Sequence, residues 1–492
     1  MKDRGRSSDG GKMLYVIKLS GEIPLKSSRT RPRFERRLVS NIVDAVSRFK
    51  FKCSEVRVSE GIIYADCDEG VENIIKDVFG VHKVCRAVKY RFDRLNDICR
   101  YAEEFFKEVV KGKKFAVRVK RVGEHEFTSM DVARVVGDVL KGYSAGVDLE
   151  NPDVEILIEI RGKDLYFYSD CLEGVNGLPI GVEGRVLMLI SGGYDSAVAS
   201  WLIAKRGAEV DFIHYVMGDY KNLVNALRVI KEVGRRLYGY SPKLYLIDLS
   251  PLITYILTNV RRDYLQVVLR RFMYLIALHI AKNNGYDAIG TGESLGQASS
   301  QTLKNLRVIE ESLPADYRLP ILRPLISMDK DEIIKIARSL GTYEDSSKVI
   351  ELCAITSGPV TTRADLNILI SESKKVGDDF IRNISNSVKV YELVNVDVYD
   401  VLNDLTLELD FIPEDVVVID ARDKKDFEKW HYSGALSIYD INLGDLPKDK
   451  PILIYCDSGQ LSSVWASALR SKGFKAFSLK GGLSTGKTCL RD

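Results

Sequence analysis

The chain has 492 residues, 45% of them hydrophobic and 29% charged, and its formal net charge is +3. This length predicts three or four domains, and the composition is typical of a soluble globular protein. Arg270 and Arg271 interrupt the longest apolar stretch, Val267 to Ile280, and the first residues lack the apolar core of a secretory signal, so we expect a cytoplasmic protein with no membrane partner.

The first part of the chain alternates short strands and amphipathic helices, which predicts small α+β units. In chain order the expected elements are a strand over 15–23, a helix over 31–49, β-rich runs within 56–67, a helix near 71–78, a helix over 93–110, a strand over 115–123, a helix over 129–140 and a hairpin of 154–160 with 164–169.

The pattern changes after Gly184. Buried apolar strands (VLMLI, VDFIHYV, LYLIDL, DAIGTG) alternate with longer helical stretches, which predicts a doubly wound parallel α/β sheet. Residues 363–412 predict helices and a linker. A second, smaller α/β pattern follows, with strands VVVIDA and PILIYC and a helix over 462–472.

Positive charge is concentrated in two stretches. Residues 1–37 contain eleven Lys and Arg against four Asp and Glu, and residues 107–121 contain seven against one. Such patches bind phosphate backbones even when the whole molecule is near neutral. The alternative is an ordinary solvated surface, and charge alone does not decide between the two.

Eight cysteines are spread along the chain, at positions 53, 67, 85, 99, 171, 353, 456 and 489. None is part of a Cys-x-x-Cys pair, which argues against a zinc ribbon or a thioredoxin-type dithiol. In a cytoplasmic protein we expect most of them to be reduced and buried as small apolar residues.

A phosphate loop is the most informative local motif. SGGYDS, Ser191 to Ser196, lies between a predicted strand and a predicted helix. Gly192 and Gly193 let backbone N–H groups turn inward, and these groups, the hydroxyls of Ser191 and Ser196 and the helix N-terminus form an anion site. Asp195 is suited to hold Mg²⁺ or to orient a reacting group. The alternative is a glycine-rich turn with a serine N-cap.

The loop lacks the Gly-Lys-Ser/Thr ending of a Walker A motif and resembles the SGGxDS motif of the PP-loop pyrophosphatases. This resemblance implies that ATP is cleaved to AMP and pyrophosphate, so that adenylation makes an oxygen of the substrate a good leaving group. It does not identify the substrate.

Further segments resemble, in the same order, the tRNA 4-thiouridine synthetase family. They are 21–38, 115–137, 177–179, 291–306 and 322–346. The resemblance implies four domains: a ferredoxin-like unit (13–68), an RNA-binding THUMP domain (69–172), a PP-loop ATP pyrophosphatase domain (173–395) and a rhodanese-like domain (410–492).

The family also implies sites on this chain. The ATP site would include Leu189, Ile190, Ser191, Gly192, Gly193, Ser196, His214, Tyr215, Arg270, Gly292 and Gln301. The candidate RNA-binding residues are Arg31, Arg33, Arg36, Arg37, Arg118, Lys120 and Arg121. For His214 the alternative is a buried histidine of the core, for Arg270 an ion pair on a helix, and for each basic residue ordinary surface charge.

Cys456 is predicted to carry the sulfur. It ends a buried strand and begins a short loop before a helix, where amides and the helix N-terminus stabilise a thiolate or persulfide. With residues 418–438 this segment resembles a rhodanese domain. Many rhodaneses have an arginine in the loop where this chain has Gln460 and Leu461, so we expect anion stabilisation to rest mainly on amides. The alternative is a buried core cysteine.

Cys353, in ELCAITSGPVTT, matches a cysteine segment of the family, which implies that it forms a transient disulfide with Cys456 after sulfur transfer. The alternative is a structural cysteine.

An Fe–S cluster needs about three cysteines grouped near the ATP site, and we find no such group and no dedicated metal site in the sequence.

The resemblance thus implies adenylation of O4 of a tRNA uridine, at position 8, and attack of the Cys456 persulfide at C4. ATP, Mg²⁺, tRNA, a cysteine desulfurase as sulfur donor and homodimer formation are implied with it. The alternatives are another PP-loop enzyme, such as a 2-thiolase or an amidating ligase, and a non-catalytic RNA-binding or sulfur-carrier protein. A second role in sulfur supply for thiamine thiazole synthesis is compatible with either.

Overall fold

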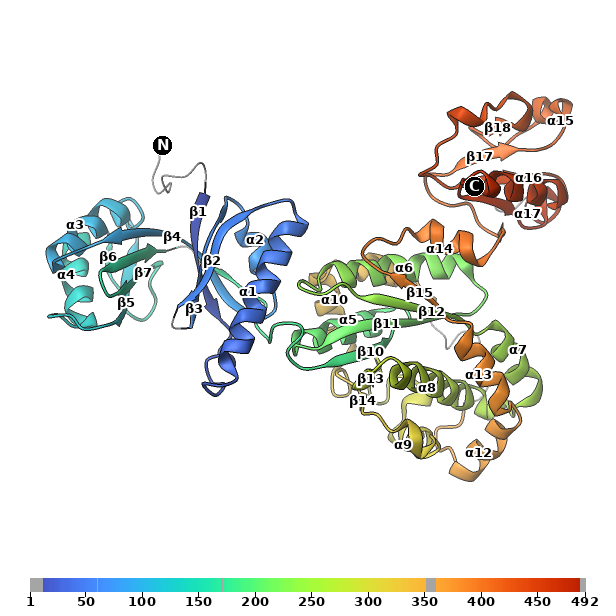
Figure 1. Ribbon diagram of the computed structural model, residues 1–492, viewed down its shortest axis with the longest axis horizontal. Helices are drawn as coiled ribbons and strands as arrows, with labels where there is room; N and C mark the ends of the chain where they lie inside the picture. The colour runs from blue at the N-terminus through green and yellow to red at the C-terminus, as the bar shows by residue number, and fades with distance from the viewer. Residues whose placement is uncertain (1–11, 60, 170, 351–359, 487–492) are drawn as a thin grey trace. The chain divides into compact units, whose positions relative to one another are not determined.

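The computed structural model describes residues 12–59, 61–169, 171–350 and 360–486 (Figure 1). The chain forms two compact units. The first comprises Met1–Gly184 with the short segments Ile203–Glu209 and Arg236–Tyr240, and the second comprises the rest. The predicted domain boundaries at 68/69, 172/173 and 395/410 remain predictions.

The first unit begins with a ferredoxin-like βαββαβ order. Its elements are β1 (Lys12–Leu19), α1 (Arg31–Arg48), β2 (Cys53–Ser59), β3 (Ile62–Asp68), α2 (Glu72–Ile75) and β4 (Val81–Arg91). Pro32 lies in the first turn of α1, and Phe34, Leu38 and Ile42, one turn apart, bury its apolar side in a core with β1 and β3. The strand order is β2-β3-β1-β4.

The sheet continues without a break into the segment that resembles a THUMP domain, because β4 also pairs with β8. The further elements are α3 (Leu95–Phe106), β5 (Lys114–Val122), α4 (Ser129–Lys141), β6 (Gly146–Val147), β7 (Val154–Arg161), β8 (Asp164–Tyr168) and β9 (Cys171–Glu173). The predicted hairpin is present as the antiparallel pair β7 and β8, and β5 runs parallel to β7. Figure 1 shows α3 and α4 beside these strands.

The expectation of reduced cysteines is wrong for four of them. Disulfides join Cys53 to Cys67 and Cys85 to Cys171. In each pair the two cysteines lie directly opposite each other on neighbouring antiparallel strands, which brings the sulfur atoms within bonding reach. The register that creates this proximity is not visible in sequence spacings of 14 and 86 residues. Among the described cysteines, Cys99 and Cys456 are free.

The second unit contains the predicted doubly wound sheet, with strand order β14-β13-β10-β11-β12-β15. Its strands are β10 (Arg185–Leu189), β11 (Glu209–Val216), β12 (Lys243–Asp248), β13 (Ala288–Gly290), β14 (Ile321–Leu322) and β15 (Lys389–Glu392). β15 is an antiparallel edge strand within the stretch for which we expected only helices and a linker.

The helices of this part are α5 (Tyr194–Lys205), α6 (Tyr220–Arg235), α7 (Ser250–Asn259), α8 (Leu265–Asn283), α9 (Leu303–Glu311), α10 (Lys330–Ser339), α11 (Tyr343–Ser347), α12 (Leu366–Lys374), α13 (Asp378–Asn386) and α14 (Val398–Leu405). Within the described ranges, one helical stretch, Arg262–Asn283, is long and apolar enough to cross a membrane by length and composition. Its most apolar window is 72% buried inside the structure, as expected of a core helix.

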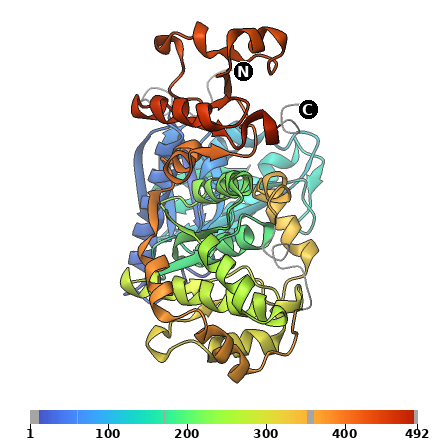
Figure 2. The ribbon, with the colours of Figure 1, turned by 90° about the vertical axis from the view of Figure 1, so that its right-hand side faces the viewer.

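The C-terminal part of the second unit is a five-stranded parallel sheet in the order β16-β20-β19-β17-β18. The elements are β16 (Glu408–Leu409), β17 (Val417–Asp420), α15 (Lys424–Lys429), β18 (Leu436–Ser437), β19 (Ile452–Tyr455), α16 (Gln460–Ser471), β20 (Ala476–Leu479) and α17 (Gly482–Gly486). Figure 2 shows this rhodanese-like segment in red.

Candidate functional site

The phosphate loop has the predicted strand–loop–helix form between β10 and α5. The Ser191 N–H donates to Ser196 Oγ at 3.1 Å, and the Gly193 N–H donates to Ser191 Oγ at 3.2 Å. The Ser196 hydroxyl donates to Gly193 O at 3.1 Å. The two serines therefore hold the loop in a fixed turn, and the first N–H groups of α5, which have no partner inside the helix, lie at its mouth.

Two glycines allow backbone to approach this loop closely. Gly192 has φ +89°, and a Cβ there would lie 2.6 Å from Ala226 Cα on α6. A Cβ on Gly292, after β13, would lie 2.7 Å from Ser196 N and 2.8 Å from Asp195 C. Because both neighbours are backbone atoms, these sites accept only glycine without a shift of the chain. β13 and the start of α5 thus meet at Gly292.

Asp195 has two partners that the sequence analysis missed. The Lys330 ammonium lies 2.9 Å from Asp195 Oδ1, and the Gln297 amide donates to Oδ2 at 2.7 Å. Lys330 is the first residue of α10, which Asp329 caps together with Glu332. A Lys following a capping aspartate signals a helix start in the sequence, but nothing local connects it to a loop 135 residues earlier.

Arg270 belongs to a buried charge network. It pairs with Glu293, which also accepts from Arg323 Nε at 2.7 Å and from the Tyr274 hydroxyl. Burial raises the pKa of Glu293, but the guanidinium groups of Arg270 and Arg323 and the hydrogen bonds outweigh it and bring the pKa down to about 2. Arg270 also donates to Ser300 Oγ at 3.1 Å, so it ties α8 to the segment after Gly292.

His214 contacts Ile190, the residue just before the phosphate loop, whereas the Tyr215 side chain points to the other side of the sheet. The buried His214 Nδ1 lies 2.8 Å from Ile190 O, so Nδ1 carries the proton. Burial lowers the pKa of His214 to about 4, which keeps the ring neutral near pH 7. Successive side chains of a strand face opposite sides, and the Tyr215 hydroxyl donates to Met273 O on α8 at 2.6 Å.

The remaining predicted ATP residues are Leu189 and Ile190, just before the loop, and Gln301, on the segment after β13. Leu189 ends β10, and the Ile190 N–H donates to Ile213 O at 3.0 Å. Gln301 Oε1 accepts from the Ser294 N–H at 3.1 Å and so fixes the chain just after Glu293.

Cys353 lies outside the described residues. The chain on either side is anchored, because Ile350 N–H donates to Asn222 Oδ1 at 2.7 Å and Thr361 N–H donates to Asp263 O at 2.9 Å.

The Cys456 sulfur lies in a nest of donors at the start of α16. It accepts from the Gly459 N–H at 3.2 Å and the Ser462 N–H at 3.4 Å, and Ser462 Oγ lies 3.5 Å away. Burial raises the pKa of this thiol, but the hydrogen bonds from Ser462, Ser458 and Gly459 prevail and lower it below its usual value. The donors are amides and one hydroxyl, in keeping with the lack of an arginine.

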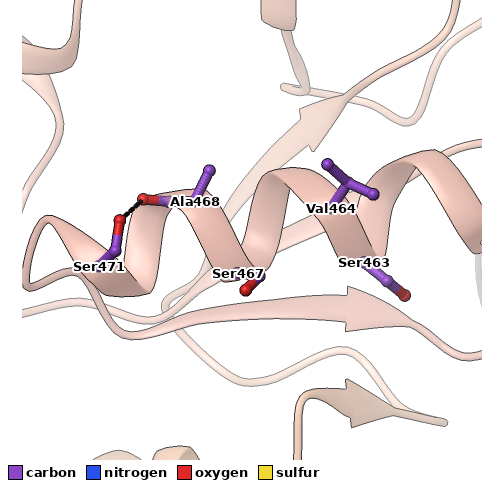
Figure 3. Close-up of a pocket in the computed structure, with 5 residues that line it drawn as sticks. All are labelled: Ser463, Val464, Ser467, Ala468 and Ser471. Carbon is purple, nitrogen blue, oxygen red and sulfur yellow. Dashed lines mark hydrogen bonds between the residues drawn. The ribbon is translucent and has the colours of Figure 1, made fainter.

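The solvent side of α16 is shallowly hollowed next to this loop. The hollow, of about 520 Å³, is lined by Ser463, Val464, Ser467, Ala468 and Ser471. Figure 3 shows Ser463 and Ser467 on one side of the helix and Val464 and Ala468 on the other.

Two of the predicted RNA-binding arginines make contacts inside the first unit. Arg37 Nε donates to Ile180 O at 2.6 Å and pairs with Glu209 at 3.1 Å, and Arg33 donates to Val182 O at 3.0 Å. These contacts attach α1 to the chain around residues 180–182. Arg31 is partly buried and Arg36 is exposed on the same helix.

The basic residues of β5 line a groove on the sheet face opposite the helices. Arg118 and Lys120 are exposed, and they share a hollow of about 360 Å³ with Lys18 of β1, His82 of β4 and Tyr168 of β8. Because side chains alternate along a strand, Arg121 faces the other side of the sheet from Lys120, and its guanidinium lies 3.0 Å from His125 Nδ1. Lys18 and His82 were missed because the sheet register, not sequence proximity, brings them to the groove.

Among the described residues, no group of three or more His, Cys, Asp or Glu side chains is arranged to hold a metal ion. Mg²⁺ that accompanies a nucleotide usually takes one or two protein carboxylates and completes its shell with phosphates and water. Asp195 is the carboxylate of the loop and is compatible with that role, provided that the Lys330 ammonium moves to the phosphates.

Family models match along the chain. They are described as the ThiI ferredoxin-like domain (14–85), the THUMP domain (92–170), thiamine biosynthesis protein ThiI (181–377) and the rhodanese-like domain (407–488). The matched ranges follow the order of the sheets described above.

Curated relatives match nearly end to end. A tRNA sulfurtransferase of Desulfurococcus amylolyticus is 42% identical over 96% of this chain and 97% of that protein. One of Pyrobaculum aerophilum is 39% identical over 95% and 97%, respectively. Among solved structures, the crystal structure of a 4-thiouridine synthetase–RNA complex with bound ATP has 27% identity and a TM-score of 0.67, over 77% of this chain and 99% of that one.

Proposed function

Because the chain belongs to the tRNA sulfurtransferase family, we propose that it uses ATP to replace O4 of a tRNA uridine, at position 8, with sulfur from Cys456. The observation that carries this proposal is that one chain contains both a glycine-rich phosphate loop, which Gly292 approaches closely, and a thiol surrounded by anion-stabilising donors. The first suits an adenylating site and the second a sulfur carrier.

ATP would bind with its phosphates at the N-terminus of α5. The amides of the loop provide fixed donors, and the neutral His214 ring keeps Ile190, the residue that leads into the loop, in place. Gly292 and Gln301 would line the other side. Arg270 would act by positioning the segment after Gly292, since its guanidinium is held by Glu293.

Asp195 and Lys330 would act as a pair in adenylation. When the triphosphate enters, the Lys330 ammonium has a stronger anionic partner than one carboxylate, and Asp195 becomes available to Mg²⁺. Uridine O4 then attacks the α-phosphorus, pyrophosphate leaves, and C4 carries an adenylate. Donors near pyrophosphate stabilise the charge that develops there.

The sulfur step would follow on that adenylate. The terminal sulfur of the Cys456 persulfide attacks C4 and AMP leaves, so that a disulfide links Cys456 to the base. The Cys353 thiolate attacks Cys456 Sγ and breaks this disulfide, which releases 4-thiouridine and leaves a Cys353–Cys456 disulfide. A two-electron reductant of the thiol class must then restore both thiols.

The tRNA would be held by the first unit. The groove with Lys18, Arg118 and Lys120 offers cations on a rigid sheet, which suits recognition of an RNA backbone by shape. Arg31, Arg36 and Arg121 lie outside this groove and would contact the RNA backbone separately, and Arg33 and Arg37 would act mainly by attaching α1. A cysteine desulfurase as donor, a homodimer and a cytoplasmic location are part of the same proposal.

Thiolation of tRNA by the purified protein, with ATP and a persulfide donor, tests the proposal. Mass spectrometry of the nucleosides should show 4-thiouridine, and Cys456→Ala should abolish it while ATP–pyrophosphate exchange continues. Asp195→Ala should stop both. Thiolation by Cys456→Ala at the original rate contradicts the sulfur route, and a 2-thio or amidated nucleoside contradicts the proposed chemistry.

The family model that matches residues 181–377 is described as a thiamine biosynthesis protein. This match favours a second role, the supply of sulfur for the thiazole ring. In a strain lacking the native protein, growth without thiazole should be restored by the intact chain and not by Cys456→Ala.

A further inference from the structure

Three serine hydroxyls form a connected group beside the Cys456 sulfur. Ser462 Oγ lies 3.5 Å from the sulfur and 2.8 Å from Ser478 Oγ of β20, and the Ser463 hydroxyl donates to Ser478 Oγ at 3.1 Å. Ser462 and Ser478 are completely buried, so water does not complete their hydrogen bonds. The sulfur is thus the end of a chain of hydroxyls that runs from Ser462 of α16 to Ser478 of β20 and back to Ser463 of α16.

The same three hydroxyls share one acceptor, the carbonyl of Gly459. Its oxygen lies 3.0 Å from Ser462 Oγ, 2.8 Å from Ser463 Oγ and 3.3 Å from Ser478 Oγ. A carbonyl has two lone pairs, and each hydroxyl has a single proton to donate. The Ser463 backbone N–H already donates to this oxygen at 3.1 Å. At most one of the three hydroxyls can therefore donate to Gly459 O as well, and at least two must direct their protons elsewhere.

The charge on the sulfur decides which arrangement is favoured. Beside a neutral thiol, Ser462 loses little by turning its proton to Gly459 O. Beside an anion, Ser462 gains most by donating to the sulfur, and Ser462 Oγ is then free to accept from Ser478, which in turn accepts from Ser463. Hydrogen bonds aligned in this way polarise one another in a water-free interior.

We propose that Ser478 is a positioning residue for the sulfur carrier, which directs the Ser462 hydroxyl to the Cys456 sulfur when the sulfur becomes an anion. This inference rests on the proposed function, in which Cys456 must be a thiolate to take up sulfur. In that ionisation the S–H bond breaks and the proton passes to water. Ser478 does not touch the sulfur and acts through Ser462.

Charged side chains on the elements around Cys456 are Glu408, Asp420, Arg422, Asp457, Arg470 and Lys480. Asp420 and Arg422 pair with each other at 2.7 Å, and Arg470 donates to backbone carbonyls. Glu408 Oε1 lies 3.3 Å from Ser463 Oγ and competes for the Ser463 proton. The contacts that lower the pKa of Cys456 are all hydrogen bonds from uncharged groups.

The test is the pH profile of Cys456 alkylation by iodoacetamide in the full-length protein, resolved by peptide mass spectrometry so that other cysteines do not interfere. For Ser478→Ala we expect the midpoint to rise by about half a unit to one unit, so that alkylation well below the midpoint slows about 3- to 10-fold. The plateau at high pH, where every thiol is ionised, should not change. Ser462→Ala should shift the midpoint further, and Ser478→Thr should return it towards that of the original protein.

Ser471→Ala is the matched control, because its hydroxyl donates only locally, to Ala468 O at 2.7 Å (Figure 3). It should leave the profile unchanged. Glu408→Gln should not raise the midpoint, since it removes a negative charge and leaves a weaker acceptor to compete for the Ser463 proton. If Ser478→Ala does not fold, Ser463→Ala, at the helix surface, should give a smaller shift in the same direction.

An unchanged midpoint in both Ser478→Ala and Ser463→Ala overturns the inference, and so does a lowered plateau with no shift, which indicates a packing role. Either result leaves the proposed function intact if Cys456→Ala fails to thiolate tRNA. Conversely, thiolation by Cys456→Ala removes the proposed function whatever the alkylation profile shows.

Discussion

Replacing Gly292 with alanine perturbs the contact between β13 and α5 most directly. The added Cβ would lie 2.7 Å from Ser196 N and 2.8 Å from Asp195 C, while ordinary van der Waals contact begins near 3.4 Å. These are backbone atoms of the first turn of α5, so no side chain can rotate away. Either the helix start or the end of β13 must shift by about 0.7 Å, the difference between these distances.

Such a shift acts on stability and on catalysis to different extents. Overpacking of this kind costs roughly 1–3 kcal/mol of unfolding free energy, whereas misplacing a reacting group by about 1 Å can cost about 100-fold in rate. We therefore expect Gly292→Ala to fold, to denature at a modestly lower urea concentration, and to form AMP about 10- to 100-fold more slowly, with weaker ATP binding.

The assay is pyrophosphate release with tRNA present, together with urea denaturation. The matched control is Gly137→Ala in α4, where a Cβ meets nothing within 4 Å. It should leave the rate unchanged and slightly stabilise its helix. A Gly292→Ala protein with the original rate and stability would refute the close approach on which this reasoning depends.

Three further predictions concern the charge network, a disulfide and the groove. The pKa of Glu293 falls from 4.5 to about 2 on folding, so its contribution, about 3 kcal/mol, is present above pH 4.5 and lost as the pH falls through 2. Urea denaturation should show about 2 kcal/mol of this loss between pH 5 and pH 3, and a Glu293→Gln protein that loses as much between these pH values would contradict it. Cys85→Ser opens a link to Cys171 across 86 residues and should lower the unfolding free energy by about 2–4 kcal/mol; an unchanged melting temperature would mean that the disulfide contributes nothing. Lys120→Glu should weaken tRNA binding and reduce the slope of the log binding constant against log salt concentration by about one. Arg37→Ala should lower the thermal stability and leave this slope unchanged. The opposite pattern would contradict the roles that we give to these two residues.

Local chemistry was predictable because it depends on neighbours in the sequence. A strand, two glycines and a helix start within a few residues suffice to identify the loop around Ser191, and a strand followed at once by a helix places Cys456 at a helix N-terminus. The alternation of strands and helices likewise predicted the doubly wound sheet. The edge strand β15 was missed, because four residues pairing at an edge leave little pattern in the sequence.

By itself the sequence determined which elements form, their order, and the residue types at the loop and the thiol. Only the tertiary structure decided which distant side chains meet: Lys330 at Asp195, Glu293 at Arg270, and the two disulfides of the first sheet. The physical reason is range. Helix and strand periodicity and anion-binding turns are set within a few residues, whereas contacts between strand ends and across sheet registers depend on how whole elements pack, and a shift of one residue in register would exchange every pair.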